Sequence, residues 1–327
     1  MRVLLLGSTG TIGLATLEAL VAQGHQVVCL VRPGRDGKVH ADLVKKIQTL
    51  NGAEIRTGLI DSEADVAQLL QQAAPLDAVV SCLASRTGTP RDAWAIDYKA
   101  HSQILRWVKQ AGINKFVLLS AICVQKPLLA FQQAKLAFEQ ELMASGLTYV
   151  IVRPTAFFKS LSGQIQRLQR GKPFMLFADG QLTACKPISD HDLGEFLALC
   201  LTDTDKFNRI LPIGGPGKAI TPLQQGEYLF KLLGKDAKYK HVPIKLMGLI
   251  VQVLKIASYL VPSLKDKAEL ARIGYYYATE SMLVWDQQTQ KYDENATPSF
   301  GTQSLFDHYQ QVISGQVEVK LGDHSVF

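Results

Sequence analysis

The chain has 327 residues, of which 47% are hydrophobic and 20% are charged. This composition is typical of globular proteins and excludes a disordered, collagen-like or disulfide-rich chain. The five cysteines are odd in number and form no CxxC pair, so we expect neither a disulfide framework nor a zinc site. The net charge of +6 would suit an anionic small ligand or an anionic membrane surface. Since no run of five like charges occurs, no nucleic-acid partner is expected.

The first 150 residues alternate short apolar runs with helical patterns. The predicted strands are Val3–Leu6, Val27–Val31, Asp77–Leu83, Phe116–Ser120 and Tyr149–Val152. The predicted helices are Leu14–Ala22, Arg91–Ala111 and Phe131–Ser145. Short apolar strands that alternate with helices predict βαβ units around a buried parallel sheet. With right-handed crossovers, this pattern gives an α/β fold with a doubly wound parallel sheet, the Rossmann fold.

The alternation of strand and helix patterns ends after Pro154, where glycine and proline recur and the predicted elements become irregular. We therefore predict a dinucleotide-binding domain over residues 1–155. A smaller α+β cap is predicted over residues 156–327, partly interleaved with the Rossmann sheet. Such a cap would cover the carboxyl ends of the strands, where α/β folds bind their ligands.

One helical pattern in the second part, Ile244–Tyr259, is apolar on nearly all sides. Its few polar or small residues fall within an arc of about 80° on a helical wheel. We favour a mostly buried helix. The alternatives are a face that contacts a pigment and a face that lies on a membrane surface. Charges at Lys245 and Lys255 and the proline at Pro262 argue against a membrane-spanning helix.

A glycine-rich motif joins the first predicted strand to the first predicted helix. It reads Gly7-Ser8-Thr9-Gly10-Thr11-Ile12-Gly13. The first glycine allows a tight turn, the second lets the backbone approach a pyrophosphate, and the third lets the helix pack on the strand. The free N–H groups of the helix N-terminus then face the anion. The motif therefore predicts a dinucleotide cofactor.

The end of the second predicted strand indicates which dinucleotide is preferred. Enzymes that use NAD place an acidic residue there, whereas residues 31–35 of this chain contain Arg32 and Arg35 and no acid. A guanidinium at this position accommodates the 2′-phosphate of NADP. We therefore predict NADPH as the cofactor.

The loop GSTGxxG is characteristic of the short-chain dehydrogenases/reductases, and the chain resembles their atypical, NmrA-like branch. Ser120 follows a strand and Lys135 lies on the next helix, as in that family, but Phe131 stands where its catalytic tyrosine would be. The resemblance implies that Lys135 is catalytic and holds the nicotinamide ribose, with Ser120 nearby. It also implies that the carboxyl end of the strand predicted at residues 77–83 lines the cofactor, together with the residue after it, namely Cys82, Leu83 and Ala84.

The segment after the last Rossmann strand reads Val152-Arg153-Pro154-Thr155-Ala156-Phe157-Phe158-Lys159. In the family it passes the nicotinamide ring, so Pro154 and Phe157 are expected to bind the cofactor. Phe157 and Phe158 are also expected to contact a flat substrate. Lys159 would stand near that substrate.

Several longer stretches are similar to the divinyl chlorophyllide 8-vinyl reductases. They are residues 152–164, 171–189, 211–227 and 274–283, together with Phe131. The resemblance implies NADPH-dependent reduction of the 8-vinyl group of divinyl chlorophyllide a or protochlorophyllide a to ethyl. It implies a Mg-tetrapyrrole substrate and suggests a cytoplasmic, bacterial enzyme, with a peripheral contact to photosynthetic membranes as a further option.

The expected chemistry explains the missing tyrosine. A conjugated vinyl group can accept hydride at its terminal carbon, and the negative charge spreads into the macrocycle, so no oxyanion forms. Lys159 and Lys186 are the preferred cations for the substrate carboxylate, with Lys172 and Lys218 as further candidates. His191 could ligate the pigment magnesium, although no protein metal site is predicted.

Two other functions stay open at this stage. Some atypical relatives bind NADP without turnover and act as redox sensors or assembly proteins, which the missing tyrosine would also allow. Alternatively, the chain could reduce another conjugated olefin with NADPH.

Overall fold

A computed structural model of the chain describes residues 1–33, 41–58, 60, 63–71 and 75–319. The chain divides into two units. Unit 1 comprises Met1–Thr87, Arg91–Arg153 and Asp190–Leu211. Unit 2 comprises Gly88–Pro90, Pro154–Ser189 and the chain from Pro212 onward.

Unit 1 is built on a seven-stranded sheet with the strand order β3-β2-β1-β4-β5-β6-β8. The neighbouring pairs from β3 to β6 are parallel. The strands are β1 (Arg2–Leu6), β2 (Gln26–Val31), β3 (Ala53–Thr57), β4 (Ala78–Ser81), β5 (Lys115–Leu119), β6 (Thr148–Pro154) and β8 (Arg209–Ile213). The order reverses between β1 and β4, which is the topological switch point where doubly wound sheets bind ligands.

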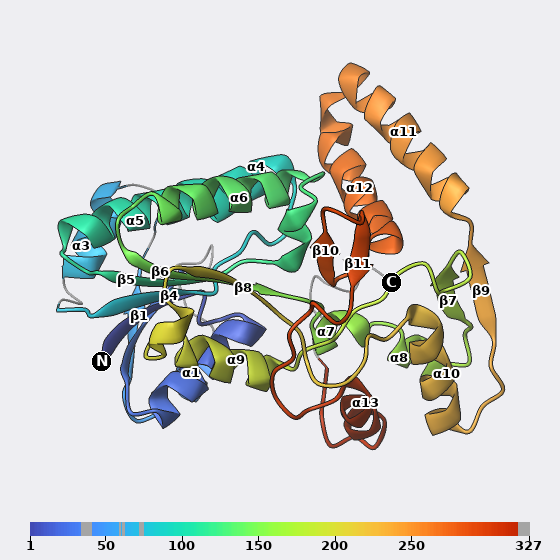
Figure 1. Cartoon of the computed structure of the whole chain (residues 1–327), viewed down its shortest axis with the longest axis horizontal. Helices are drawn as coiled ribbons and strands as arrows, with labels where there is room; N and C mark the ends of the chain where they lie inside the picture. The colour runs from blue at the N-terminus through green and yellow to red at the C-terminus, as the bar shows by residue number, and fades with distance from the viewer. Residues whose placement is uncertain (34–40, 59, 61–62, 72–74, 320–327) are drawn as a thin grey trace. The chain divides into compact units, whose positions relative to one another are not determined.

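Helices cover both faces of this sheet (Figure 1). On one face lie α1 (Thr11–Ala22) and α9 (Asp190–Leu199); on the other lie α5 (His101–Gln110) and α6 (Ala130–Met143). Between these elements are α2 (Ala41–Gln48), α3 (Glu63–Gln71), α4 (Pro90–Ala93), a π-helical turn (Trp94–Ala100) and 3₁₀ turns at Ile122–Gln125 and Thr204–Lys206. Because helices bury both faces, the central strands are almost entirely apolar and unexposed.

Unit 2 mixes short helices with two small sheets. Strands β7 (Phe174–Phe177) and β9 (Tyr239–Val242) pair in parallel, and β10 (Val284–Asp286) pairs antiparallel with β11 (Lys291–Asp293). Its helices are α7 (Phe158–Leu161), α8 (Ile165–Gln169), α10 (Pro222–Leu233), α11 (Ile244–Leu260), α12 (Lys265–Thr279), α13 (Leu305–Ile313) and a 3₁₀ turn at Pro262–Leu264. Its separate core is lined by residues such as Phe174, Leu229 and Tyr309.

The predicted fold class is confirmed: the molecule has a Rossmann sheet and a smaller C-terminal α+β part. The chain returns to unit 1 at Asp190–Leu211, which supplies α9 and the start of β8. Gly194 of α9 fixes the approach of α9 to α1, since a Cβ at this position would lie 2.6 Å from the carbonyl carbon of Ala15.

The prediction that Ile244–Tyr259 forms a mostly buried helix is wrong. The segment does form a helix, α11, but none of its residues is buried. Only one side of α11 packs, and it packs against α12. Hydrophobicity on all sides of a helix predicts burial only when neighbours cover all sides, and the sequence pattern does not show which neighbours are present.

Candidate active site

The glycine loop between β1 and α1 has a shape that only glycine permits. Gly7 has φ +75°, and the Gly10 amide donates to the Gly7 carbonyl oxygen at 3.0 Å. A Cβ on Gly13 would lie 2.0 Å from that same oxygen, far inside the closest approach of real atoms. The turn therefore requires glycine at both ends, as the motif predicted.

Gly10 ends the loop as the N-cap residue of α1 and has no side chain to satisfy the helix N–H groups. Thr9, Gly10 and Thr11 are exposed, while Ser8 and Ile12 are buried. The first turn of α1 contains no acidic residue. An exposed helix N-terminus of this kind favours an anion such as a pyrophosphate.

The segment after β4 lies against the glycine loop. A Cβ on Gly7 would come within 2.7 Å of the Cys82 carbonyl carbon and 2.8 Å of the Leu83 nitrogen. The Cys82 amide donates to the Leu6 carbonyl oxygen at 2.9 Å, and Ala84 is exposed beyond this contact. The structure thus brings two segments predicted to bind the cofactor together at the switch point of the sheet.

Arg32 follows β2 directly and is exposed. Arg35, the second predicted cation, lies outside the described residues. An exposed guanidinium at the end of β2 is available to a cofactor phosphate.

Lys135 of α6 forms an ion pair with Asp97, with Nζ 3.0 Å from Oδ1. The side chain of Lys135 is 12% exposed and that of Asp97 is fully buried. The Asp97 Oδ1 also accepts a hydrogen bond from the Ser85 amide at 3.1 Å. Within the described part of the chain, its Oδ2 has no hydrogen-bond partner. Lys135 is therefore held in place beside an acceptor that a water or a ligand hydroxyl can satisfy.

Asp97 sits in the π-helical turn Trp94–Ala100. Single π turns within helices occur often at functional sites. His101 follows this turn; its Nδ1 donates to the Ile96 carbonyl oxygen at 2.9 Å, and its Nε2 accepts from the Ser81 hydroxyl at 2.7 Å. Burial, together with the nearby Lys135 charge, lowers the pKa of His101 to about 4. The imidazole is therefore neutral at pH 7 and fixes the turn without adding charge.

Ser120 belongs to a second buried network. Its hydroxyl donates to Glu139 Oε1 at 2.5 Å, and Arg153 pairs with the same carboxylate. Phe131, Lys135 and Glu139 are spaced four residues apart and so share one face of α6. The half-buried Phe131 ring offers no proton, so this face contains an ammonium and a carboxylate but no phenol.

The predicted pigment-binding residues lie in unit 2. Phe157 precedes α7 and forms an isolated bridge with Ile188. Phe158 is 3% exposed and belongs to the unit 2 core, while Lys159 is half-buried. The buried Lys186 ammonium donates to the Thr297 carbonyl oxygen at 3.0 Å. Pro154, the last residue of β6, is buried.

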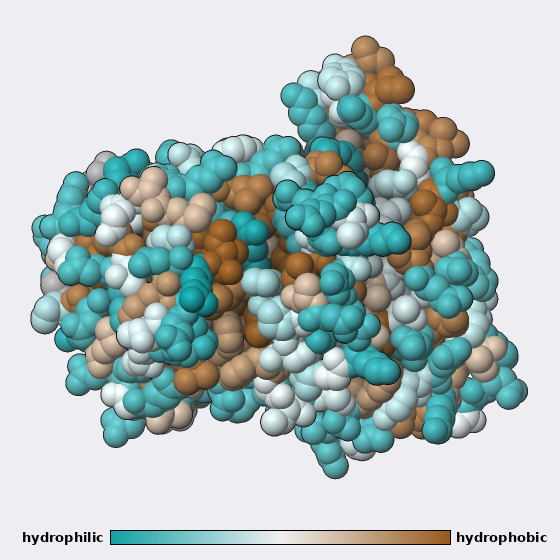
Figure 2. All heavy atoms as spheres, viewed as in Figure 1, coloured by the Kyte–Doolittle hydropathy of each residue, from teal (hydrophilic) through white to brown (hydrophobic). Residues whose placement is uncertain are grey.

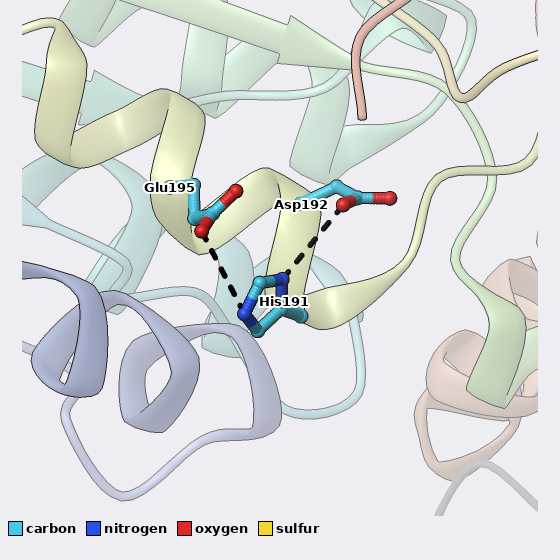
Figure 3. A group of neighbouring side chains, drawn as sticks. All are labelled: His191, Asp192 and Glu195. Carbon is cyan, nitrogen blue, oxygen red and sulfur yellow. Dashed lines mark ion pairs between the residues drawn. The ribbon is translucent and has the colours of Figure 1, made fainter. Parts of the chain in front are cut away.

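His191, Asp192 and Glu195 form a small cluster at the start of α9 (Figure 3). The His191 ring nitrogens each lie 3.7 Å from one carboxylate oxygen of Asp192 or Glu195. His191 and Glu195 are exposed, so the cluster has the character of a solvated ion-pair group.

Comparison with known proteins also indicates a protein that binds a dinucleotide. A model of the NAD(P)H-binding family matches residues 7–204. The divinyl chlorophyllide a 8-vinyl-reductase of Cucumis sativus, described as chloroplastic, is 48% identical over an alignment that covers 100% of this chain and 80% of the relative. The chain belongs to the divinyl chlorophyllide a 8-vinyl-reductase family.

A more distant relative outside the 8-vinyl-reductase family is the photosystem II assembly factor Ycf39 of Synechocystis. It is 26% identical over 76% of this chain and 72% of its own length. Among solved structures, AtPrR2 with NADP⁺ and (+)pinoresinol has a TM-score of 0.67 at 16% identity, covering 94% of this chain and 97% of that one. This likeness shows a shared fold.

For this 8-vinyl-reductase family member, sequence reasoning identified Lys135 and Ser120 but missed their partners. Asp97 lies 38 residues before Lys135, and Glu139 is an acid within an amphipathic helix. Neither forms a motif with its partner, because the pairs are made by packing between elements. One local signal was available: Lys135 and Glu139 are four residues apart, on the helix face expected to carry the catalytic groups.

Proposed function

We propose that this chain reduces the 8-vinyl group of divinyl chlorophyllide a or divinyl protochlorophyllide a to ethyl, with NADPH as reductant. The observation that carries this function is the 48% identity to an 8-vinyl-reductase over the whole chain. Since this identity extends beyond residues 7–204, which the NAD(P)H-binding family model matches, it supports more than a shared cofactor fold.

The glycine loop fits a dinucleotide. The N-terminus of α1 at Gly10 is exposed and has no Cβ, and Cys82 and Leu83 lie alongside Gly7. A pyrophosphate can therefore come close to the backbone N–H groups of this helix end. The bound nicotinamide would supply the hydride. We propose that Lys135, positioned by Asp97, holds the nicotinamide ribose, with Ser120 close to that site.

The side chains also fit the reduction of an olefin. Reduction of a carbonyl requires a proton at an oxygen, which the family tyrosine normally gives, whereas charge from a vinyl group delocalises into the tetrapyrrole. Phe131 in place of tyrosine is compatible with that chemistry. The task left to the protein is to orient a large flat substrate.

We propose NADPH rather than NADH because an arginine, Arg32, and not an acidic residue directly follows β2. Arg32→Asp should raise the KM for NADPH about 10- to 100-fold, the equivalent of one charged hydrogen bond of roughly 1.5–3 kcal/mol. The KM for NADH should fall or stay constant, since a carboxylate can accept from the ribose 2′-hydroxyl.

Steady-state kinetics with both cofactors check this prediction. Arg209→Asp, which changes an exposed arginine at the start of β8, is the matched control and should leave both KM values unchanged. Equal use of NADPH and NADH by the unmodified protein would show that Arg32 does not select the cofactor.

On the substrate side, we propose Phe157 and Lys159 as the main pigment contacts. Lys159 would orient the pigment through its carboxylate. Phe158 and Lys186 are both buried, whereas Phe157 and Lys159 are partly exposed. Their predicted pigment contacts stay predictions with less support from the geometry. The same holds for Pro154 at the nicotinamide.

Lys159→Ala should lower kcat with the pigment about 100-fold, because a small misplacement of the reacting group can cost that much in rate. The affinity for NADPH, measured by fluorescence titration, should stay within twofold. Lys231→Ala, at an exposed lysine of α10, is the control. Unaltered pigment kinetics in Lys159→Ala would remove this residue from the site.

The function itself is tested by incubating the full chain with NADPH and divinyl chlorophyllide a, then with divinyl protochlorophyllide a. Chromatography should show conversion to the 8-ethyl product, and the faster of the two reactions identifies the preferred pigment. NADPH binding without conversion of either pigment would favour a non-catalytic role, for which the similarity to Ycf39 is the supporting observation. The expected cytoplasmic location stays a prediction.

A further inference from the structure

Helix α11 exposes an unusual number of large apolar side chains. Brown, hydrophobic atoms dominate the surface over this helix in Figure 2. The exposed fractions lie between 46% and 83% for six leucine, isoleucine and valine residues: Leu246, Leu249, Ile250, Val253, Ile256 and Leu260. We call these six residues the apolar arc. Contiguous exposed apolar surface of this kind marks a binding surface in soluble proteins.

The apolar arc occupies one side of α11, opposite to the side that packs on α12. At about 100° per residue the six residues span roughly 120°. The half-buried Met247, Val251 and Leu254 lie on the other side. There, a Cβ on Gly248 would come within 3.5 Å of the Tyr275 ring of α12. The arc therefore faces away from the packing that holds the helix.

A polar strip borders the apolar arc on one side. It contains Lys245, Gln252, Lys255 and the 75%-exposed Tyr259, within about 80° of the helical wheel. The chain has five lysines and no acidic residue between Asp236 and Asp266. The surface is thus apolar and exclusively cationic, which is the complement of an anionic lipid surface.

We propose that α11 is a membrane-docking helix that lies in the surface of a bilayer containing anionic lipids. The apolar arc enters the boundary between headgroups and acyl chains, Tyr259 lies at headgroup level, and the lysines contact lipid phosphates. The reduction reaction does not depend on this docking, and the docking does not depend on the proposed substrate.

The length and charge of α11 exclude a spanning mode. At 17 residues the helix is about 26 Å long, short of a hydrocarbon core of about 30 Å. Lys255 would lie within that core. Among the described residues, we find no helix with both the length and the apolar character needed to cross a bilayer.

A second copy of the chain fits this surface less well. In a two-fold interface the same patch meets itself, so the lysines of one strip would approach those of the other without an acid between them. An anionic bilayer offers both an apolar layer and compensating charge.

The test uses the full chain and sedimentation with vesicles of phosphatidylcholine alone or of phosphatidylcholine and phosphatidylglycerol at 1:1. The unmodified chain should partition at least tenfold more strongly onto the anionic vesicles, and added salt should weaken that binding. Leu249→Gln/Ile256→Gln should lower the partition coefficient at least tenfold. Lys245→Gln/Lys255→Gln should remove most of the preference for phosphatidylglycerol.

The matched controls remove equally exposed groups elsewhere. Leu128→Gln/Leu182→Gln, at leucines that are 54% and 51% exposed, should bind vesicles as the unmodified chain does. So should a double substitution of two exposed lysines, Lys109→Gln/Lys231→Gln. All variants should keep their circular dichroism spectrum and their activity on detergent-dispersed pigment, which separates docking from the reaction.

Three results would overturn the proposal. The unmodified chain could fail to bind anionic vesicles. The arc variants could convert a dimer to a monomer in sedimentation velocity without an effect on vesicle binding, which would make the arc an interface between copies. They could also lose activity on dispersed pigment while still binding vesicles, which would make the arc a pigment-contacting face.

Discussion

Replacing Lys135 with alanine is expected to lower kcat/KM about 10- to 100-fold and to lower the melting temperature. The ammonium is 3.0 Å from Asp97 and both side chains are largely withdrawn from water. Loss of a charged hydrogen bond to the cofactor costs roughly 1.5–3 kcal/mol of binding free energy, which corresponds to the expected decrease in kcat/KM. The stability effect arises because Asp97 would remain as a buried carboxylate without its partner, at a cost of roughly 3–5 kcal/mol.

The double variant Lys135→Ala/Asp97→Ala separates these two effects. Removing both charges should restore most of the melting temperature but none of the activity. Lys109→Ala, at an exposed position of α5, should change neither quantity. If Lys135→Ala kept normal activity and normal NADPH affinity, the lysine would have no role in catalysis or cofactor binding.

Gly13→Ala is expected to disrupt the cofactor loop. The new Cβ would lie 2.0 Å from the Gly7 carbonyl oxygen and 2.7 Å from its carbon, and both are backbone atoms that cannot turn away. The start of α1 must therefore shift. Overpacking of this kind costs about 1–3 kcal/mol and sometimes more. For a unit of this size, each kcal/mol of destabilisation lowers the melting temperature by roughly 2–4 °C. NADPH binding, measured by isothermal titration, should be lost.

Gly274→Ala is the control for this substitution. Gly274 lies inside α12, and among the described residues no atom beyond its own helix would come within 4 Å of the added methyl group. Alanine should stabilise the helix by about 0.5–1 kcal/mol because glycine has the lower helix propensity. NADPH binding should be unchanged. Equal and normal NADPH binding by both variants would show that the loop geometry is not needed for the cofactor.

The sequence predicted the parts of the fold that have strong local signals. The predicted Val3–Leu6 and Val27–Val31 match β1 and β2 to within one residue, because buried central strands are uniformly apolar. The strand β3 was missed, because its sequence, AEIRT, is half polar and only partly buried. The edge strand β8 was also missed: its sequence, RILPI, is mostly apolar, but Pro212 within it argues against a strand. Edge positions relax the pattern that identifies a strand.

The candidate site was likewise predictable only in part. The glycine loop could be predicted because its backbone conformation requires glycine at particular positions. Lys135 was predicted as a site residue from its place in a family pattern. The pairing of Lys135 with Asp97 depends on the π-helical turn. The sequence of that turn, WAIDYKA, contains no proline or glycine from which it could be predicted. The sequence showed that α11 is apolar but did not show that the apolar arc is exposed. Periodicity alone does not distinguish a helix surface that packs on a neighbour from one that does not.

A nicotinamide bound to this chain is expected to reduce the 8-vinyl group itself. NADPH deuterated at both C4 positions, incubated with the protein and divinyl chlorophyllide a, tests this most directly. Mass spectrometry and proton NMR of the product should find one deuterium per pigment, on the terminal carbon of the new 8-ethyl group. A label on the inner carbon would reverse the proposed polarity. An 8-ethyl product without deuterium, or no conversion at all, would contradict the account.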